Sequence, residues 1–137
     1  MIRLPLLTAL LIVMAPGPAS APVSGWSAVD GDGVRAPDGT VYRVASVDTP
    51  ELKGRCRFET ALAYKARAFT SEQLRRGEVA VRVVGWDRNY DRPVAVVTVN
   101  GQRLDRLLIS NGLGRPYNCL HDKARGDKCP PRQGWCA

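Results

Sequence analysis

The order of short β-like segments around one long helical segment constrains the fold of this chain most. Valine-rich stretches separated by Gly, Asp and Asn turn signals predict strands, and a proline-free stretch with helical periodicity lies between the third and the fourth. The predicted strands cover residues 26–29, 34–36, 41–47, 79–84 and 94–99. This order indicates an α+β fold, mainly β, and is typical of a five-stranded OB-type Greek-key barrel, whose closure removes exposed strand edges.

Two helices are predicted. The longer one covers residues 58–76 and ends on two arginines and a glycine, which complement the helix dipole and release the backbone. Its apolar stripe consists of Phe58, Leu62, Ala66 and Phe69. The shorter helix covers residues 104–111, with leucines on one face. We therefore expect one long helix between the third and fourth strands and a short helix after the fifth.

The first 21 residues have the three parts of a secretory signal peptide. Arg3 supplies the positive start, residues 4–14 the apolar run, and Ala19-Ser20-Ala21 a small-residue exit. The apolar run is too short to span a hydrocarbon core about 30 Å thick, which argues against a membrane anchor. Because Pro22 directly follows this exit, the cleavage point stays open, with a cut after Ala19 or further on as alternatives. We expect a secreted or periplasmic monomer without stable membrane association.

The remaining chain divides into a domain at residues 22–117 and a Cys/Pro/Gly-rich tail at residues 118–137. Four cysteines in an exported chain predict two disulfides, and sequence alone leaves three connectivities open. The pairing that we favour joins Cys119 to Cys129 and Cys56 to Cys136, which would tie the tail to the domain. A zinc site is the alternative because His121 lies among the tail cysteines, but the spacing matches no common zinc site.

The chain is strongly basic. It carries 20 Lys and Arg against 13 Asp and Glu, a formal net charge of +7. Such a balance suits a polyanionic partner, either nucleic acid or an anionic surface. A solvated basic face without any partner is the alternative, and charge alone leaves both open.

Three carboxylates and two arginines form a candidate chemical set, to which Thr49 adds a backbone carbonyl. The carboxylates lie at predicted strand ends or in loops, where they can converge, and oxygen donors without His or Cys favour Ca²⁺ or Mg²⁺. Guanidinium groups suit the binding of a phosphate and of its transition-state charge. Together these groups suit phosphodiester hydrolysis, although each segment alone is also explained as a turn or loop. The set consists of Asp32, Asp48, Glu51, Arg43 and Arg92.

Four motifs carry a resemblance to a known family. They are VDGD at 29–32, YRVASVDTPE at 42–51, YDRPVA at 90–95 and NGLGRPY at 111–117. An arginine five residues before Asp-Thr-Pro-Glu, with Tyr-x-Arg before the next strand, is a specific combination. The motifs occur in the family's order and spacing, and the chain resembles a staphylococcal-nuclease-like domain of the thermonuclease family over residues 26–117.

The resemblance implies a Ca²⁺-dependent endonuclease on an OB-type barrel that cuts DNA and RNA, with Mg²⁺ as the alternative metal. By position, the metal ligands are Asp32, Asp48 and the Thr49 carbonyl. Glu51 would act on the attacking water as general base or positioner, and Arg43 and Arg92 would bind the phosphate. The nucleotide site would be lined by Arg88, Tyr90 and Tyr117.

The chain also departs from the family pattern. Gly33 stands where the family usually has Thr or Ser, and the loop at residues 87–92 is one residue longer than usual. Asp91 directly precedes Arg92 and could pair with it or add a negative charge beside the phosphate, and either would weaken the phosphate clamp. The tail replaces the family's third helix. Two alternatives therefore remain: a non-catalytic OB-type nucleic-acid-binding module, and a disulfide-stabilised exported domain with a different ligand.

The strand at residues 41–47 poses a geometric problem. Strict alternation places Arg43 on one face and Asp48 on the other. We expect barrel curvature and the turn imposed by Pro50 to bring Arg43 and Asp48 together in one cleft with Asp32, Glu51 and Arg92.

Overall fold

The computed structural model describes residues 25–119 and 129–137. The expected signal peptide and His121 lie outside these residues. The strands are β1 (Ser27–Ala28), β2 (Gly33–Arg35), β3 (Val41–Val44), β4 (Val47–Asp48), β5 (Val79–Asp87), β6 (Arg92–Val99), β7 (Gln102–Arg103) and β8 (Arg115–Pro116). The helices are α1 (Arg57–Arg76) and α2 (Leu104–Ser110), within one residue of the predicted bounds. Among the described residues, none of the helices has the length and apolar character needed to span a membrane.

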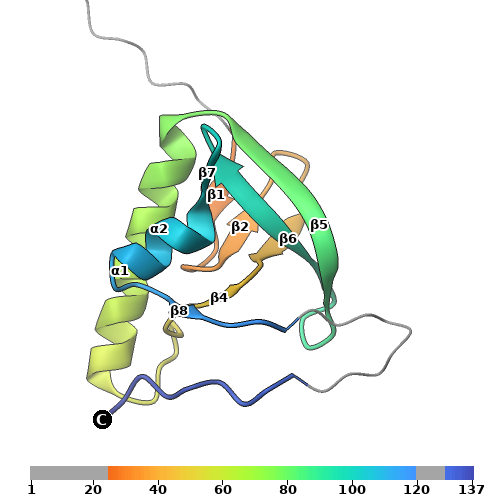
Figure 1. Ribbon diagram of the computed structural model, residues 1–137. Coiled ribbons are helices and arrows are strands. Elements are labelled where there is room, and N and C mark those ends of the chain that lie inside the picture. The colour runs from red at the N-terminus through yellow and green to blue at the C-terminus, as the bar shows by residue number, and fades with distance from the viewer. Residues whose placement is uncertain (1–24, 120–128) are drawn as a thin grey trace, which may run out of the picture.

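The strands form a mixed, curved sheet (Figure 1). Its order is β1-β2-β3-β6-β5, with β7 also paired to β6, and β4 pairs with β8 in a separate two-stranded sheet. Only the β3–β6 pair is parallel among the pairs described. The expectation of five strands in a closed barrel differs from this arrangement, because eight strands are described and no pairing among them joins β5 to β1. The fold is α+β and mainly β, with an open sheet.

The predicted third strand is broken in two. β3 ends at Val44 and β4 begins at Val47, because Ser46 adopts the left-handed region at φ 66°. The Ala45 N–H still donates to the Ala95 carbonyl at 2.8 Å, so the chain leaves the sheet only after this residue. β4 is then free to pair with β8.

The buried face of α1 agrees with the predicted stripe only in part. Ala66 is buried and Phe69 packs against the core, as expected. The buried apolar and hydroxyl side chains of α1 are Ala63, Ala66, Thr70 and Leu74. Phe58 is 63% exposed, so its assignment to the buried stripe was wrong. The buried face follows a spacing that starts one residue later, at Glu59, because small residues there allow close approach of the neighbouring loop.

One hydrophobic core lies between the sheet and the two helices, which lie together at one side of it (Figure 1). α1 contacts β1, β6 and α2, and α2 also contacts β4 and β8. The core consists of Ala28, Val34, Val44, Val47, Leu74, Ala95, Val97, Val99, Leu104 and Leu108. This packing fixes the two ends of the broken strand, from which the candidate site is built.

The disulfides have the favoured pairing. Cys56 is bonded to Cys136 and Cys119 to Cys129. The first bond joins the residue before α1 to the end of the chain, and the described part of the tail runs back beside β8 to the start of α1 (Figure 1). The tail therefore lies next to the loop that carries Glu51.

Candidate active site

The loop that carries Asp30 and Asp32 is seated directly on α1. The Thr70 hydroxyl donates to the Gly31 carbonyl at 2.7 Å. A Cβ at Gly31 would lie 2.8 Å from the Ala66 Cβ, closer than side chains approach, so only glycine allows this packing. The small residues on α1 thus fix the position of the first two carboxylates.

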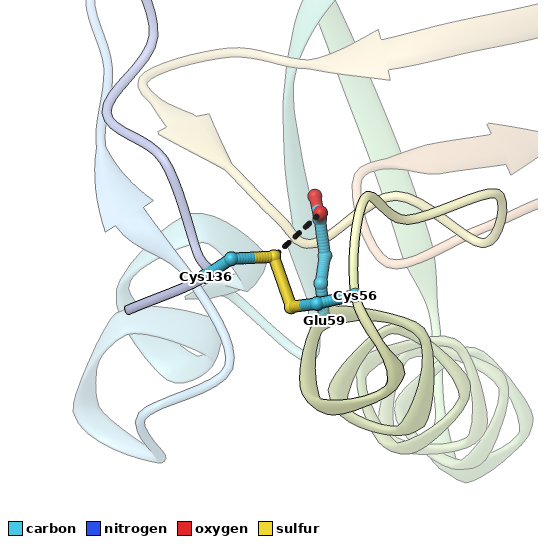
Figure 2. Close-up of side chains that lie close together, drawn as sticks. All are labelled: Cys56, Glu59 and Cys136. Carbon is cyan, nitrogen blue, oxygen red and sulfur yellow. Dashed lines mark hydrogen bonds between the residues drawn. A yellow bond between two sulfur atoms is a disulfide. The ribbon is translucent and has the colours of Figure 1, made fainter.

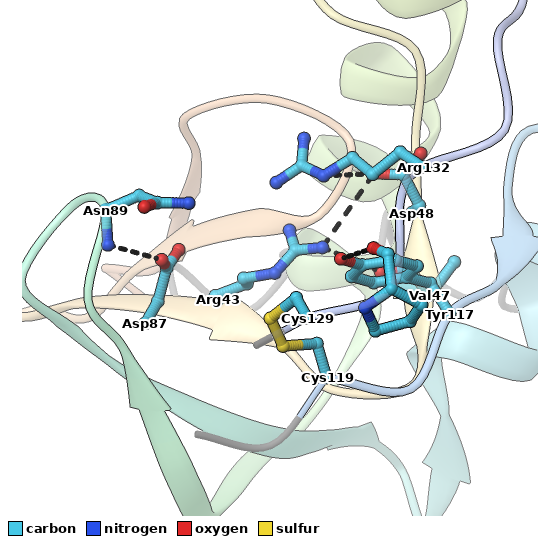
Figure 3. The surroundings of a disulfide bond; sticks show 10 residues. Arg43, Val47, Asp48, Asp87, Asn89, Tyr117, Cys119, Cys129 and Arg132 are labelled. Atoms are coloured by element: carbon cyan, nitrogen blue, oxygen red, sulfur yellow. Dashed lines mark hydrogen bonds and ion pairs between the residues drawn. A yellow bond between two sulfur atoms is a disulfide. The ribbon is translucent and has the colours of Figure 1, made fainter. Parts of the chain in front are cut away.

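A buried ion pair joins this loop to the broken strand. Arg43 Nη1 donates to Asp32 Oδ2 at 2.9 Å, and Nη2 donates to the Val47 carbonyl at 3.2 Å. Arg43 Nη2 also lies 3.8 Å from Asp48 Oδ1 (Figure 3). The backbone N–H of Thr49 donates to Asp32 Oδ2 at 3.1 Å. Asp32, Arg43, Asp48 and Thr49 are each at most 6% exposed, so the structure brings them together in a buried corner.

Glu51 lies in the loop after this corner, and Glu59 of α1 organises that loop. Buried Glu59 accepts the N–H of Arg55 at 2.7 Å and the N–H of Glu51 at 3.4 Å. The Glu51 side chain is 49% exposed, as catalysis on a water would require. Glu59 is therefore a residue that the motif comparison missed; a carboxylate in the first turn of a helix is its only sequence signal.

Glu59 also lies close to both sulfurs of the Cys56–Cys136 disulfide (Figure 2). The two sulfurs and a carboxylate oxygen all lie within 4.8 Å of one another, an arrangement that resembles a metal-binding cluster. The sulfurs are bonded to each other, however, so neither is a thiolate ligand. The group is a structural link between the tail and α1.

Arg92 lies beside the turn of the β5–β6 hairpin and pairs with Asp87. Its Nε donates to Asp87 Oδ2 at 3.2 Å, and its guanidinium lies 4.8 Å from the centroid of the Tyr90 ring. Of the two alternatives considered for Asp91, pairing with Arg92 is not observed, because the Asp91 carboxylate accepts from Trp86 Nε1 at 3.0 Å. Asp87 also accepts the Asn89 N–H at 3.1 Å and so shapes the hairpin turn (Figure 3).

Gly33 brings the Arg92 side of the site close to Asp30. A Cβ at Gly33 would lie 2.6 Å from Asp30 Oδ1 and 3.4 Å from Arg92 Nη1. The absence of the family's usual Thr or Ser therefore makes room for the Asp30 carboxylate. Asp30 therefore belongs to the candidate site. The candidate set predicted from the sequence contained only Asp32 from the loop that carries both residues.

A cavity of about 640 Å³ lies next to the candidate site residues. Its lining includes Asp30, Asp48, Thr49, Glu51, Tyr90, Arg132 and Trp135. A smaller cavity of about 50 Å³ adjoins Arg43, Asp87, Tyr117 and Arg132. Arg88 is exposed on the β5–β6 hairpin and lines neither of these cavities. The structure thus brings together the predicted carboxylates, Arg43 and Tyr90. Arg92, which was expected in the same cleft, lines neither of these cavities and is linked to the larger one only through its contact with Tyr90.

The tail contributes a third arginine, Arg132, which was not among the site residues predicted from the sequence. Arg132 Nη1 donates to Glu51 Oε1 at 2.7 Å, and its Nε lies 3.4 Å from Asp48 Oδ1 (Figure 3). The Tyr117 hydroxyl, expected at the nucleotide site, donates to the Pro130 carbonyl at 2.9 Å. The one available signal was the Cys56–Cys136 pairing, which places the tail near a cysteine that follows Glu51 closely in sequence.

The carboxylates repel one another and lose hydration in this corner. Burial, together with the Asp32 charge, raises the pKa of Asp30 to about 6, although Arg92 opposes this shift. Burial also raises the pKa of Asp48, against the effect of Arg132 and Arg43. Burial of Arg132 disfavours its charge, but the carboxylates of Asp48, Asp32 and Glu51 outweigh this and raise its pKa. The corner favours additional positive charge.

The donor set fits a hard cation. Asp30 Oδ1 and Asp48 Oδ1 are buried side-chain oxygens that accept no hydrogen bond, although Asp48 Oδ1 faces the Arg132 and Arg43 guanidinium groups at 3.4 Å and 3.8 Å. Such oxygens carry a desolvation cost that a bound cation would offset. Carboxylate and carbonyl oxygens without imidazole or thiolate suit Ca²⁺ or Mg²⁺.

Comparison with known proteins agrees with the geometry. The family model described as staphylococcal nuclease homologue matches residues 41–130, about two thirds of the chain. A search of curated proteins found no match. The matched range contains β3, β4, both helices, Arg43, Glu51 and Arg92. The chain belongs to the staphylococcal nuclease homologue family.

Proposed function

We propose that this chain is an exported, Ca²⁺-dependent endonuclease that hydrolyses phosphodiester bonds of DNA and RNA. The observation that carries the proposal is the convergence of Asp32, Asp48 and Arg43 in one buried corner beside the exposed carboxylate of Glu51. Family membership supports a nuclease or nucleic-acid-binding domain. A curved sheet with α1 packed across it supports an OB-type Greek-key barrel as the underlying fold.

In this proposal the cation is held by Asp32, Asp48 and the Thr49 carbonyl, with Asp30 adjacent. A bound Ca²⁺, or Mg²⁺ in its place, would polarise a phosphoryl oxygen and neutralise developing charge. We assign two roles to Arg43 in this corner. It fixes the orientation of Asp32 through the 2.9 Å hydrogen bond and supplies positive charge at the smaller cavity, which it lines.

Glu51 is the residue that we assign to the attacking water. Its side chain is half-exposed at the cavity, and its loop is fixed by Glu59, so the carboxylate can accept a proton or orient the water. Arg92 is assigned to the phosphate from its position beside Tyr90, which lines the larger cavity. Its pairing with Asp87 leaves the two terminal guanidinium nitrogens outside the Nε–carboxylate hydrogen bond.

Binding of nucleotides is assigned to Tyr90, Arg88 and Tyr117. Tyr90 is 63% exposed and lines the larger cavity, so its ring offers a stacking surface. A site built on phosphate contacts and stacking would read little base sequence. The expected signal peptide and the two disulfides support a secreted or periplasmic location, and we propose a monomer.

A digest series tests this function. Supercoiled plasmid and single-stranded RNA are incubated with the purified mature protein in Ca²⁺, in Mg²⁺ or in chelator. We expect cleavage of both substrates with Ca²⁺ and none with chelator. Cleavage that persists unchanged in chelator, or its absence under all conditions, would exclude the proposed activity.

A non-catalytic nucleic-acid-binding module is the second candidate. The ion pair of Glu51 with Arg132 and that of Arg92 with Asp87 favour it, because both engage groups that catalysis would use. Salt-sensitive binding of single strands that is indifferent to chelator, without cleavage in the digest series, would select this candidate.

A further inference from the structure

Arg132 bridges two carboxylates of the candidate site from a segment far away in sequence. Its guanidinium contacts Glu51 at 2.7 Å and Asp48 at 3.4 Å. The Arg132 side chain is 34% exposed, so part of it is withdrawn from water. Figure 3 shows it beside Asp48 and above the Arg43 guanidinium. The tail thus inserts one positive charge among Asp30, Asp32, Asp48 and Glu51.

Three independent contacts hold the tail in place. The Arg115 guanidinium donates to the Gly134 carbonyl at 2.6 Å and lies 4.0 Å from the centroid of the Trp135 ring. The Tyr117 hydroxyl binds the Pro130 carbonyl, and Cys136 is covalently bonded to Cys56. Arg132 lies between these anchors. Its effective concentration at the carboxylates is therefore set by the fold and does not depend on a free tail.

The guanidinium uses the same oxygens that a cation would need. Asp48 is a proposed ligand, and Glu51 is the proposed partner of the attacking water. A carboxylate oxygen that faces Arg132 at these distances cannot also face a cation without a rearrangement of the arginine. Neutralisation of the buried carboxylates by Arg132 also reduces the repulsion that would otherwise favour cation binding.

We propose that Arg132 is a further residue of this site, an internal competitor that occupies the carboxylates when no cation is bound and sets the affinity for Ca²⁺. This inference rests on the proposed cation site. Binding of Ca²⁺ displaces the guanidinium from Glu51 and Asp48, and the anchors at Arg115, Tyr117 and Cys136 keep the tail beside the cavity.

Calorimetric titration of the metal-free protein with Ca²⁺ at constant ionic strength tests the competition. Arg132→Gln keeps the disulfide and removes the guanidinium, and we expect its Kd for Ca²⁺ to fall about three- to tenfold. Arg106→Gln removes the same charge from an exposed position on α2 and should leave the Kd within about twofold of the unaltered protein.

Equal Ca²⁺ affinities of Arg132→Gln and Arg106→Gln would overturn the inference and leave the proposed cation site intact. Absence of Ca²⁺ binding by all three proteins would overturn both. The side-chain Nε–H NMR signal of Arg132, assigned by its absence from the R132Q spectrum, gives a second readout. It should shift on saturation with Ca²⁺, and an unchanged signal would overturn the displacement.

Discussion

Arg43 of β3 and Asp32, in the loop directly before β2, form a buried ion pair at 2.9 Å at the corner of the candidate site. Gly33, next to Asp32, is the register partner of Arg43 in the β2–β3 pair, so the pair closes this end of the sheet. Both side chains are less than a tenth exposed. The Asp32 carboxylate also receives the Thr49 N–H, so one oxygen organises both strand ends. This pair is structural before any ligand binds.

Arg43→Gln should lower the free energy of unfolding of the metal-free protein by about 3 kcal/mol, because it leaves a buried carboxylate without its counter-charge. Urea unfolding followed by circular dichroism measures this loss. Arg35→Gln, at an exposed position on β2, is the matched control and should change the free energy by less than about 0.5 kcal/mol. Equal effects of the two substitutions would show that the ion pair does not stabilise the corner.

Asp30→Asn should stabilise the metal-free protein, and more so at pH 8 than at pH 5. The folded pKa of about 6 lies above the ordinary aspartate pKa of 3.8, so the folded state disfavours the charged carboxylate. This destabilisation grows as pH rises from 3.8 and is complete above the folded pKa. The gain from Asn should therefore be about 1 kcal/mol larger at pH 8, as measured by urea unfolding at both values.

Asp38→Asn provides the control for this pH effect. Hydrogen bonds from Thr40 lower the pKa of the exposed Asp38 carboxylate, which contributes stability above its unfolded pKa that is lost as pH falls through the lower folded value. Between pH 5 and 8 it stays ionised, so its substitution should have the same effect at both. A pH-independent gain for Asp30→Asn would contradict the raised pKa.

Glu59→Ala should both destabilise the protein and misplace Glu51. The substitution removes the acceptor of two backbone N–H groups, at a cost of about 2 kcal/mol. Glu59→Gln keeps one carbonyl acceptor and should lose less. Unfolding experiments give the stability, and hydrogen exchange of the Glu51 and Arg55 amides gives the local effect. Unchanged exchange in Glu59→Ala would refute the role of Glu59 in fixing this loop.

The fold was predictable where local signals are strong. The alternating valines, the long proline-free helix and the Asp-Gly and Asn-Gly turns gave α1, α2, β5 and β6 nearly as observed. The break at Ser46 was not predictable, because a serine carries no signal for the left-handed region. Curvature and Pro50 were expected to bring Arg43 to Asp48; the backbone turn lies earlier, between Val44 and Val47.

The prediction of the buried face of α1 was wrong at Phe58, and the reason is again that a tertiary contact leaves no local sequence signal. Phe58 is apolar and falls on a helical spacing, but it lies in the first turn, and the buried face is defined by Ala63, Ala66 and Thr70 against the Gly31 loop. Small side chains have a weak hydrophobic signal. Close packing of backbone on helix is a tertiary property that periodicity does not report.

The candidate site also contains residues that the motifs predicted and residues that only the tertiary structure reveals. Motifs identified Asp32, Arg43, Asp48 and Glu51, which the structure brings together. Arg132 carries no motif and reaches the site only through the tail anchors and the disulfide. The choice of Asp87 over Asp91 as the partner of Arg92 depends on the hairpin geometry, since Asp91 has φ 47° and binds Trp86.

The most direct test of the central claim is the rate of plasmid cleavage by Glu51→Gln at saturating Ca²⁺. Loss of a group that accepts or orients the attacking water should lower the rate about 100-fold or more while leaving the unfolding transition nearly unchanged. Glu78→Gln, which changes an exposed carboxylate directly before β5, should cleave like the unaltered protein. Cleavage by Glu51→Gln at the rate of Glu78→Gln would contradict the account.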